Sequence, residues 1–267
     1  MSRRHWHDLP EAVRAAVRRH TGEIRQVWPV ATGAVSDIVA VLDTETGPYF
    51  CKGVAAANPL AWMHRNEARL NPYLTRCAPR LLWQADREGW LLLGFTHVPG
   101  RHLDLAPGSA DLAPLTDTLI FLSGVASPPV PVQAATARWA DRLPPGIVDG
   151  EALNHTDVTP RNFLLTGTGI VVVDWSMPCR GAAWIDTALM VIRLIRAGHH
   201  PDQAQAWAGR IPVWRSAPAE SLDAFAAANA ALLRERHHRS GAPHLGLLAE
   251  AAAAWSSHRR RQSSMAW

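Results

Sequence analysis

The fold is decided by two short stretches of sequence, NHTDVTPRNFLL at residues 154–165 and VVVDW at residues 171–175. In the first stretch Asn162 follows Asp157 by five residues, and Asp174 follows Asn162 by twelve residues at the end of a β-branched run. The residues between them have the pattern of a hairpin, with a turn at GTG, residues 167–169. Because the hairpin returns the chain, we expect Asn162 and Asp174 at the same end of it.

These three side chains are the set that transfer of a γ-phosphoryl group requires. The transition state spreads negative charge over the phosphoryl oxygens, so catalysis depends on positioning and on cations. A carboxylate must orient the attacking hydroxyl, and two oxygen ligands must hold Mg²⁺ against the phosphates. The spacing of Asp157, Asn162 and Asp174 therefore favours a phosphotransferase site, although an Asp after a strand is often only a cap.

With His155 included, the pattern HxDxxxxN followed by a strand that ends in Asp resembles the catalytic loop and metal-binding Asp of the protein-kinase-like superfamily. It is more closely similar to the aminoglycoside phosphotransferase family, whose loop is usually HGDxxxxN. The resemblance implies that Asp157 is the catalytic base, that Asn162 and Asp174 bind Mg²⁺, and that ATP is the phosphoryl donor. His155 would brace the loop, while Arg161 would either stabilise the transferring phosphate or pack the loop.

Two residues of this region depart from the family pattern, and a third follows it. Thr156 stands where the family usually has Gly, and Ser176 stands where Glu or Gly is common. Neither change removes a ligand, but both reshape the floor of the site and so bear on the acceptor. Asp186 resembles a family Asp that supports the catalytic loop from a neighbouring helix.

Lys52 is the only lysine in the chain, against 26 arginines, and it lies inside an apolar stretch. A lysine offers a compact point charge and an arginine a planar fork, so a lone lysine here indicates a site that a guanidinium does not fit. The family places a lysine on the third strand, where it contacts the α- and β-phosphates, and an acidic partner on the next helix. The resemblance assigns these roles to Lys52 and Glu67.

Two further segments resemble the nucleotide-contacting parts of the family. VATGAVS, residues 30–36, resembles a shortened phosphate-covering loop, with Gly33 and Ser36 as its contact residues. Residues 91–98 resemble the last strand and the hinge, whose backbone would read the adenine edge at Gly94, Phe95 and His97. The resemblance spans residues 24–195, with its motifs in the expected order.

Hydrophobic periodicity predicts an α+β fold with a small antiparallel β lobe at residues 1–97 and a larger, mainly helical lobe at residues 98–267, and the resemblance implies that this is the protein-kinase-like two-lobe fold. Five strands with one helix laid against them are expected in the first lobe, at residues 24–30, 35–43, 48–54, 80–86 and 90–96, with the helix at 59–75. A separate opening helix is predicted at residues 10–21. The second lobe is expected to hold helices at residues 112–125, 134–143, 184–197, 201–209, 219–239 and 245–261.

Composition excludes several classes of protein. No apolar run approaches the roughly 18 residues of a membrane span, and the first residues lack the apolar block of a secretory signal, so we expect no membrane partner. Three separated cysteines without a CxxC pair favour a reducing cytoplasm over a disulfide framework or a zinc site. The arginine-rich runs are not interleaved with aromatic residues, so no nucleic-acid partner is expected.

The acceptor is expected to be a small-molecule hydroxyl such as that of an antibiotic, sugar or metabolite. Only eleven residues lie between Asp174 and Asp186, which leaves no room for the activation segment that docks a polypeptide. Carboxylates are sparse after residue 197, so a neutral or anionic acceptor is favoured over a polycationic aminoglycoside. Two alternatives stay open: a Ser/Thr kinase for a biosynthetic precursor peptide, acting with a partner protein, and a catalytically silent binding module.

Overall fold

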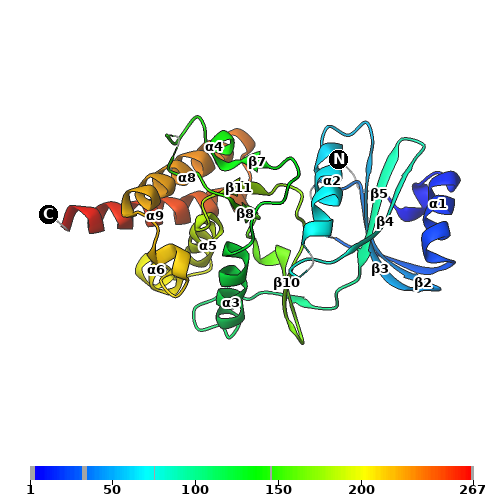
Figure 1. The fold of residues 1–267 in the computed structure, drawn as a ribbon, viewed down its shortest axis with the longest axis horizontal. Helices are drawn as coiled ribbons and strands as arrows, with labels where there is room; N and C mark the ends of the chain where they lie inside the picture. The colour runs from blue at the N-terminus through cyan, green and yellow to red at the C-terminus, as the bar shows by residue number, and fades with distance from the viewer. Residues whose placement is uncertain (1–3, 32–34, 75, 145, 266–267) are drawn as a thin grey trace. The chain divides into compact units, whose positions relative to one another are not determined.

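The computed structural model describes residues 4–31, 35–74, 76–144 and 146–265 (Figure 1). The chain forms two compact units. The first comprises Met1–Arg101 together with Val171–Met177, and the second comprises His102–Ile170 together with Pro178–Trp267. The short segment that carries Asp174 therefore belongs with the N-terminal unit, although it lies far along the sequence. Each unit is thus made of two separate stretches of chain, so a single boundary in the sequence cannot divide them.

The first unit is built on a five-stranded antiparallel sheet of order β1-β2-β3-β5-β4. β-Branched and aromatic residues dominate its strands, as is typical of a pleated and half-buried surface. Its strands are β1 (Ile24–Pro29), β2 (Ile38–Thr44), β3 (Gly47–Ala55), β4 (Leu81–Arg87) and β5 (Trp90–Thr96). The five predicted strands are confirmed; tight turns join β2 to β3 and β4 to β5, while β3 and β5 become neighbours through a longer connection that contains α2.

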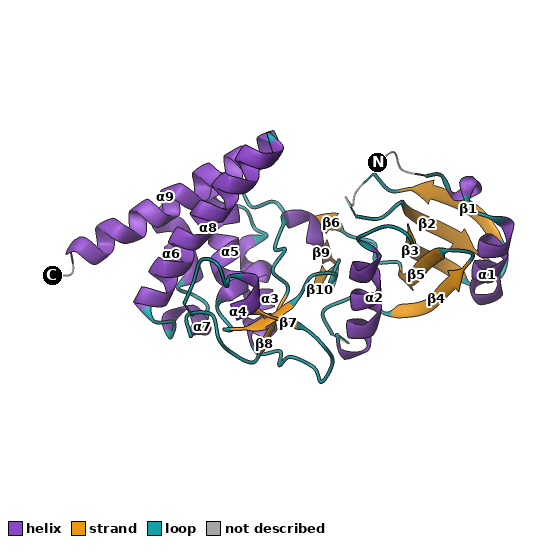
Figure 2. Cartoon of the chain, turned by 90° about the horizontal axis from the view of Figure 1, so that it is seen from above, coloured by secondary structure: helices purple, strands orange, loops and turns teal. Residues whose placement is uncertain are grey.

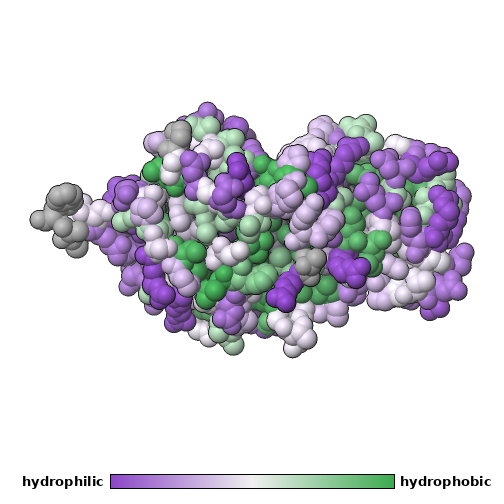
Figure 3. Space-filling model, in the orientation of Figure 1, coloured by the Kyte–Doolittle hydropathy of each residue, from purple (hydrophilic) through white to green (hydrophobic). Residues whose placement is uncertain are grey.

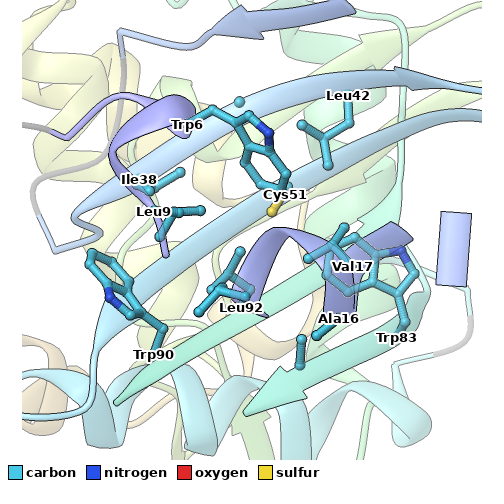
Figure 4. Packing of buried hydrophobic residues seen from close by; sticks show 13 residues of the cluster. Trp6, Leu9, Ala16, Val17, Ile38, Leu42, Cys51, Trp83, Trp90 and Leu92 are labelled. Atoms are coloured by element: carbon cyan, nitrogen blue, oxygen red, sulfur yellow. The ribbon is translucent and has the colours of Figure 1, made fainter. Parts of the chain in front are cut away.

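Both faces of this sheet are covered, where one helix had been expected against it. Helix α1 (Glu11–Thr21) is amphipathic, and Val13, Ala16 and Val17 join a buried cluster with residues of β2, β3, β4 and β5 (Figure 4). Helix α2 (Ala61–Leu70) packs on β3 and β5, and the short helix η2 (Asn71–Tyr73) follows it. The opening helix predicted from its 3.6-residue periodicity thus supplies the second cover.

The alternation of β3 decides which residue faces which helix. Cys51 belongs to the cluster on the α1 side, while Val54 belongs to a second cluster that includes Leu91, Leu93 and Ala61 of α2. Successive side chains of a strand point to opposite faces of the sheet, so Lys52 shares the face of Val54. The sheet therefore places the single lysine on the side that α2 covers.

The second unit is mainly helical (Figure 2). Its two longest helices, α8 (Ala219–Ser240) and α9 (Pro243–Met265), pack against each other, and α5 (Ile185–Arg196) packs against α9. The other helices are α3 (Leu112–Ser123), α4 (Ala135–Arg138), α6 (Pro201–Ala208) and α7 (Pro212–Arg215), with η3 (Pro160–Asn162) in the loop that holds Asp157 and η1 (Trp6–Asp8) at the start of the first unit.

Short strands complete the fold, and the sequence predicted only one pair of them. A sheet of order β7-β11-β8 joins β7 (Gln133–Ala134), β8 (Ala152–Asn154) and β11 (Cys179–Gly181). A sheet of order β10-β9-β6 contains the predicted hairpin, as β6 (Arg101–His102), β9 (Phe163–Thr166) and β10 (Gly169–Val172). β8 leads into the loop of Asp157, and β9 leaves it.

One predicted helix is much shorter than expected. The helix expected at residues 134–143 is only α4, because Trp139 leaves helical geometry with φ −115° and ψ 17°. Its ring is buried against Phe225 of α8, with 5.2 Å between the ring centroids. Burial of this large side chain outweighs the local helical pattern, which is the usual outcome when tertiary packing and propensity disagree. Within the described ranges, no helix combines the length and apolarity needed to cross a membrane.

Candidate active site

In the first unit, Lys52 lies at the centre of a buried charge cluster. Its side chain is buried, and its ammonium group forms ion pairs with Glu67 of α2 and with Asp174, whose Oδ1 lies 3.0 Å from Nζ. The ammonium also lies 5.7 Å from the centre of the Phe95 ring. The structure thus brings together three residues that lie far apart in the sequence, including the predicted Lys52–Glu67 pair.

The two carboxylates keep Lys52 protonated despite its burial. Burial is the largest influence and lowers the pKa of Lys52, but the charges and hydrogen bonds of Glu67 and Asp174 together outweigh it, so the pKa is raised. The folded protein therefore presents a fixed ammonium at neutral pH. An ammonium group of this kind can bind the anionic oxygens of a phosphate, and the carboxylate of Asp174 beside it can serve as an oxygen ligand for a cation.

Asp174 is held in an unusual backbone conformation, with φ 64°. The following residue, Trp175, is fully buried, and its indole N–H donates to the carbonyl of Val172 at 3.0 Å. Val172 itself donates its backbone N–H to Cys77 at 2.7 Å, and Asn66 of α2 donates to the carbonyl of Ser176 at 3.4 Å. These contacts hold the segment in place, which is how a left-handed Asp persists.

In the second unit, Asp157 and Asn162 meet at the two ends of one loop. The Asn162 side-chain nitrogen donates to the Asp157 carbonyl at 2.9 Å and to Oδ2 of the same residue at 3.1 Å. Thr159 caps the short helix η3, with its hydroxyl accepting from the backbone N–H of Arg161 at 3.2 Å. The carboxylate of Asp157 is half exposed, so a ligand can reach it.

The loop is clamped from α5 by Asp186, as the sequence predicted. Its two carboxylate oxygens accept the backbone N–H groups of His155 at 2.7 Å and of Thr156 at 2.8 Å. Burial raises the pKa of Asp186, while the histidine and the two N–H groups oppose that rise. His155 in turn accepts the backbone N–H of Asp157 through Nδ1 at 3.2 Å, so it braces the loop.

Arg193 is a neighbour of Asp157 that sequence reasoning missed. Its guanidinium lies 3.6 Å from Oδ1 of Asp157, and its side chain is only one-fifth exposed. Among the described residues this guanidinium has no hydrogen-bond partner, so most of its donors are available to a ligand. A charged residue inside the apolar run LMVIRLI of a predicted helix was the signal that would have found it.

The orientation of Asn162 fits the predicted magnesium site. Its side-chain nitrogen is occupied by Asp157, and among the described residues its amide oxygen accepts no hydrogen bond. An amide oxygen and a carboxylate are ligands that Mg²⁺ accepts, with substrate phosphates and water completing the shell. No group of three or more His, Cys, Asp and Glu side chains in the described part of the chain converges on a metal position. The assignment of Asn162 and Asp174 as Mg²⁺ ligands therefore stays a prediction.

The remaining predicted contact residues are placed as follows. Gly33 lies outside the described residues, and Ser36 bonds His64 of α2, with Oγ and Nε2 3.0 Å apart. Gly94 and Phe95 lie within β5 and have partners in register on both β3 and β4, and their predicted contact with adenine stays a prediction.

Two predicted residues lie outside regular strands and long helices. His97 comes just after β5 and is half-buried. Its predicted contact with the adenine edge stays a prediction. Arg161 is exposed, and among the described residues its guanidinium has no partner. Its place in the loop leaves both predicted roles, phosphate stabilisation and loop packing, as predictions.

Comparisons with known proteins bear on the fold and on the region that carries these residues. The sequence model of the "Phosphotransferase enzyme family" matches residues 122–219, which include the loop of Asp157, the segment of Asp174 and helix α5. No curated protein sequence gives a match. A thermostable mutant of the aminoglycoside phosphotransferase APH(4)-Ia superposes with a TM-score of 0.59 at 13% identity, over 93% of this chain and 98% of that one. The chain has the protein-kinase-like fold and resembles the aminoglycoside phosphotransferases.

Two more solved structures share this fold. An aminoglycoside phosphotransferase from Alicyclobacillus acidocaldarius gives a TM-score of 0.57 at 14% identity, over 96% of this chain and 97% of that one. Choline kinase LicA from Streptococcus pneumoniae gives 0.58 at 11% identity, again over 96% and 97%. The same fold therefore occurs in proteins named for chemically different acceptors, so the fold leaves the acceptor open.

Proposed function

We propose that the protein is an ATP-dependent phosphotransferase that moves the γ-phosphoryl group to a hydroxyl of a small molecule. The observation that carries the proposal is the pair of prepared charge sets: Lys52 held by Glu67 and Asp174, and Asp157 held beside Asn162 by the clamped loop. The match to the phosphotransferase family model supports it, as does a structural neighbour crystallised with AMP-PNP and hygromycin B.

In this proposal each residue has a separate task. Lys52 binds phosphate oxygens, and Asp157 accepts a hydrogen bond from the acceptor hydroxyl and takes its proton as the new bond to phosphorus forms. Asn162 and Asp174 would hold Mg²⁺, which neutralises charge on the phosphates when bound. Arg161 is proposed to bind the transferring phosphoryl group. Glu67 orients Lys52, and Asp186 and His155 keep Asp157 in place.

Two substitutions of one kind separate these tasks. Asp157→Asn keeps the shape of the loop but removes the proton acceptor, so ATP turnover should fall by at least about 100-fold while MgATP binding stays nearly unchanged. Asp174→Asn should instead weaken Mg²⁺-dependent nucleotide binding. Calorimetric titration with MgATP and an assay of ADP release measure the two effects. Wild-type turnover by Asp157→Asn would show that the catalytic assignment is wrong.

We infer that the acceptor is neutral or anionic, as the scarcity of carboxylates after residue 197 suggests. The observation that supports this inference is Arg193, a largely buried guanidinium 3.6 Å from Asp157. A cation at this point repels a polycationic acceptor and can pair with a carboxylate or phosphate beside the reacting hydroxyl. We therefore use the hygromycin-bound neighbour as support for the class of reaction, and we do not infer the identity of the acceptor from it.

Matched hydroxyl compounds test the charge of the acceptor. Glycerol, glycerate and choline carry the same kind of hydroxyl beside a neutral, anionic or cationic group, and kanamycin serves as the polycation. We expect ATP turnover to be stimulated by the neutral or anionic member of such a set, and Arg193→Met to remove any preference for the anion. Rapid phosphorylation of kanamycin or choline would contradict the inference.

The peptide alternative would gain support from a contiguous apolar face on the helical unit. Among the described residues of that unit, the exposed large hydrophobic side chains are Ile120 and Phe121 of α3 and Leu247 of α9. Figure 3 shows apolar patches interrupted by polar side chains on the face it presents. These three residues do not form such a face, so no second function is proposed.

A further inference from the structure

Within the first unit, the segment that leads into β2 is tied to the start of α2 at two neighbouring residues. Ser36 bonds His64 of α2, with 3.0 Å between Oγ and Nε2. The carboxylate of Asp37 accepts the backbone N–H of Ala55 at 2.8 Å and the side-chain nitrogen of Asn58 at 3.3 Å. The residue that follows Ser36 is therefore hydrogen-bonded to the turn that precedes α2.

His64 is buried and neutral, which limits how it bonds Ser36. The side chain is 1% exposed, and its Nδ1 has no hydrogen-bond partner among the described residues. Burial, and then the charge of Lys52, lower the pKa of His64 to about 4, so the ring carries one proton at neutral pH. A proton on Nδ1 would be a buried donor without an acceptor, which is rarer in proteins than a buried acceptor without a donor.

The proton therefore belongs on Nε2, where it is donated to the hydroxyl oxygen of Ser36. A serine hydroxyl has one proton to donate and lone pairs that accept. Since His64 occupies a lone pair, the hydroxyl proton of Ser36 remains for another acceptor. In the opposite tautomer the Ser36 hydroxyl would donate its proton to the ring nitrogen. It would then have only lone pairs left and could not donate a hydrogen bond to a phosphate.

We propose that His64 is a positioning residue that turns the Ser36 hydroxyl into a hydrogen-bond donor for a nucleotide phosphate. This inference rests on the proposed phosphotransferase function and extends it. His64 lies three residues before Glu67, so both project from the same face of α2. One helix thereby fixes both phosphate-binding groups of this unit, Lys52 through Glu67 and Ser36 through His64.

Binding of a nucleotide, Mg·AMP-PNP, and of a nucleoside, adenosine, to four variants tests the proposal. Mg·AMP-PNP carries the phosphates and adenosine does not, so their dissociation constants separate phosphate contacts from general damage to the site. We expect His64→Leu and Ser36→Ala each to weaken AMP-PNP binding about tenfold and adenosine binding less than twofold. The double variant should lose no more than either single variant, because both remove the same contact. His64→Gln, which can donate from a similar position, should restore most of the affinity.

Each contrary result has its own meaning. If wild type binds AMP-PNP and His64→Leu binds it equally well, the inference is overturned and the proposed function stands. Equal weakening of AMP-PNP and adenosine, or additive losses in the double variant, would show only a structural role and overturn it too. If His64→Leu does not fold, wild-type AMP-PNP affinity in Ser36→Ala overturns the inference. Failure of the wild type to bind AMP-PNP would remove the proposed function together with the inference.

Discussion

At the scale of the residue, Thr156 shows why the family loop usually has glycine at this position. Its φ is 65°, in the left-handed region that β-branched residues avoid. The strain persists because Asp186 accepts the N–H groups of both His155 and Thr156 and so fixes the peptide between them. A left-handed conformation costs an L-residue about 1–2 kcal/mol, and glycine escapes that cost.

Replacement of Thr156 by glycine and by alanine isolates this strain, because both substitutions remove the hydroxyl and the methyl group. At an ordinary loop position alanine is the more stabilising by about 0.4–1 kcal/mol, through the entropy of the unfolded chain. At residue 156 we expect the order to reverse, with Thr156→Gly about 1 kcal/mol more stable than Thr156→Ala. Urea unfolding of the two variants measures the difference, and a more stable alanine variant would show that the backbone is unstrained.

Single residues also show how far the sequence could predict the site. Lys52 was predicted because composition made it unique, and the structure pairs it with Glu67. The predicted backbone contact of Gly94 with adenine stays a prediction, while a Cβ there would lie 1.9 Å from Cε2 of Trp83, so packing also requires glycine. Arg193 was missed because the run LMVIRLI marks it only as a charged residue in an apolar stretch, whereas its position beside Asp157 depends on how α5 packs against the loop.

At the scale of the element, prediction succeeded where local pattern and burial agree. Strand β5 coincides with the predicted range 90–96, because its turn and its apolar residues are both local signals. The helix expected at residues 134–143 shrank to α4 because burial of Trp139 against α8 pulled the chain out of the helix. The three-residue strands β8 and β11 escaped prediction, since such short pairings are defined by their partners.

At the scale of the whole molecule, the segment Val171–Met177 connects two stretches of the second unit and itself belongs to the first. It leaves the hairpin of the second unit's loop and belongs to the first unit, where Asp174 pairs with Lys52. Asn162 and Asp174, the two proposed Mg²⁺ ligands, thus reside in different units and are separated by only eleven residues of chain. If both serve one nucleotide, binding must stabilise the two units together.

Unfolding with and without MgATP tests this coupling. A ligand at about 100 times its dissociation constant adds about 2.7 kcal/mol, which raises the Tm of a chain of this size by roughly 5–10 °C. We expect this rise to require Mg²⁺, to be lost in Lys52→Ala, and to be reduced by Asn162→Ala, although Asn162 lies in the other unit. Arg210→Ala, at an exposed residue of that second unit, is the matched control and should keep the full shift.

Hydrogen exchange should slow at β3 and at β9 alike, because one ligand would then hold both. Protection confined to β3, with an undiminished shift in Asn162→Ala, would show that the nucleotide binds the first unit alone and that Asn162 is not a ligand of its metal.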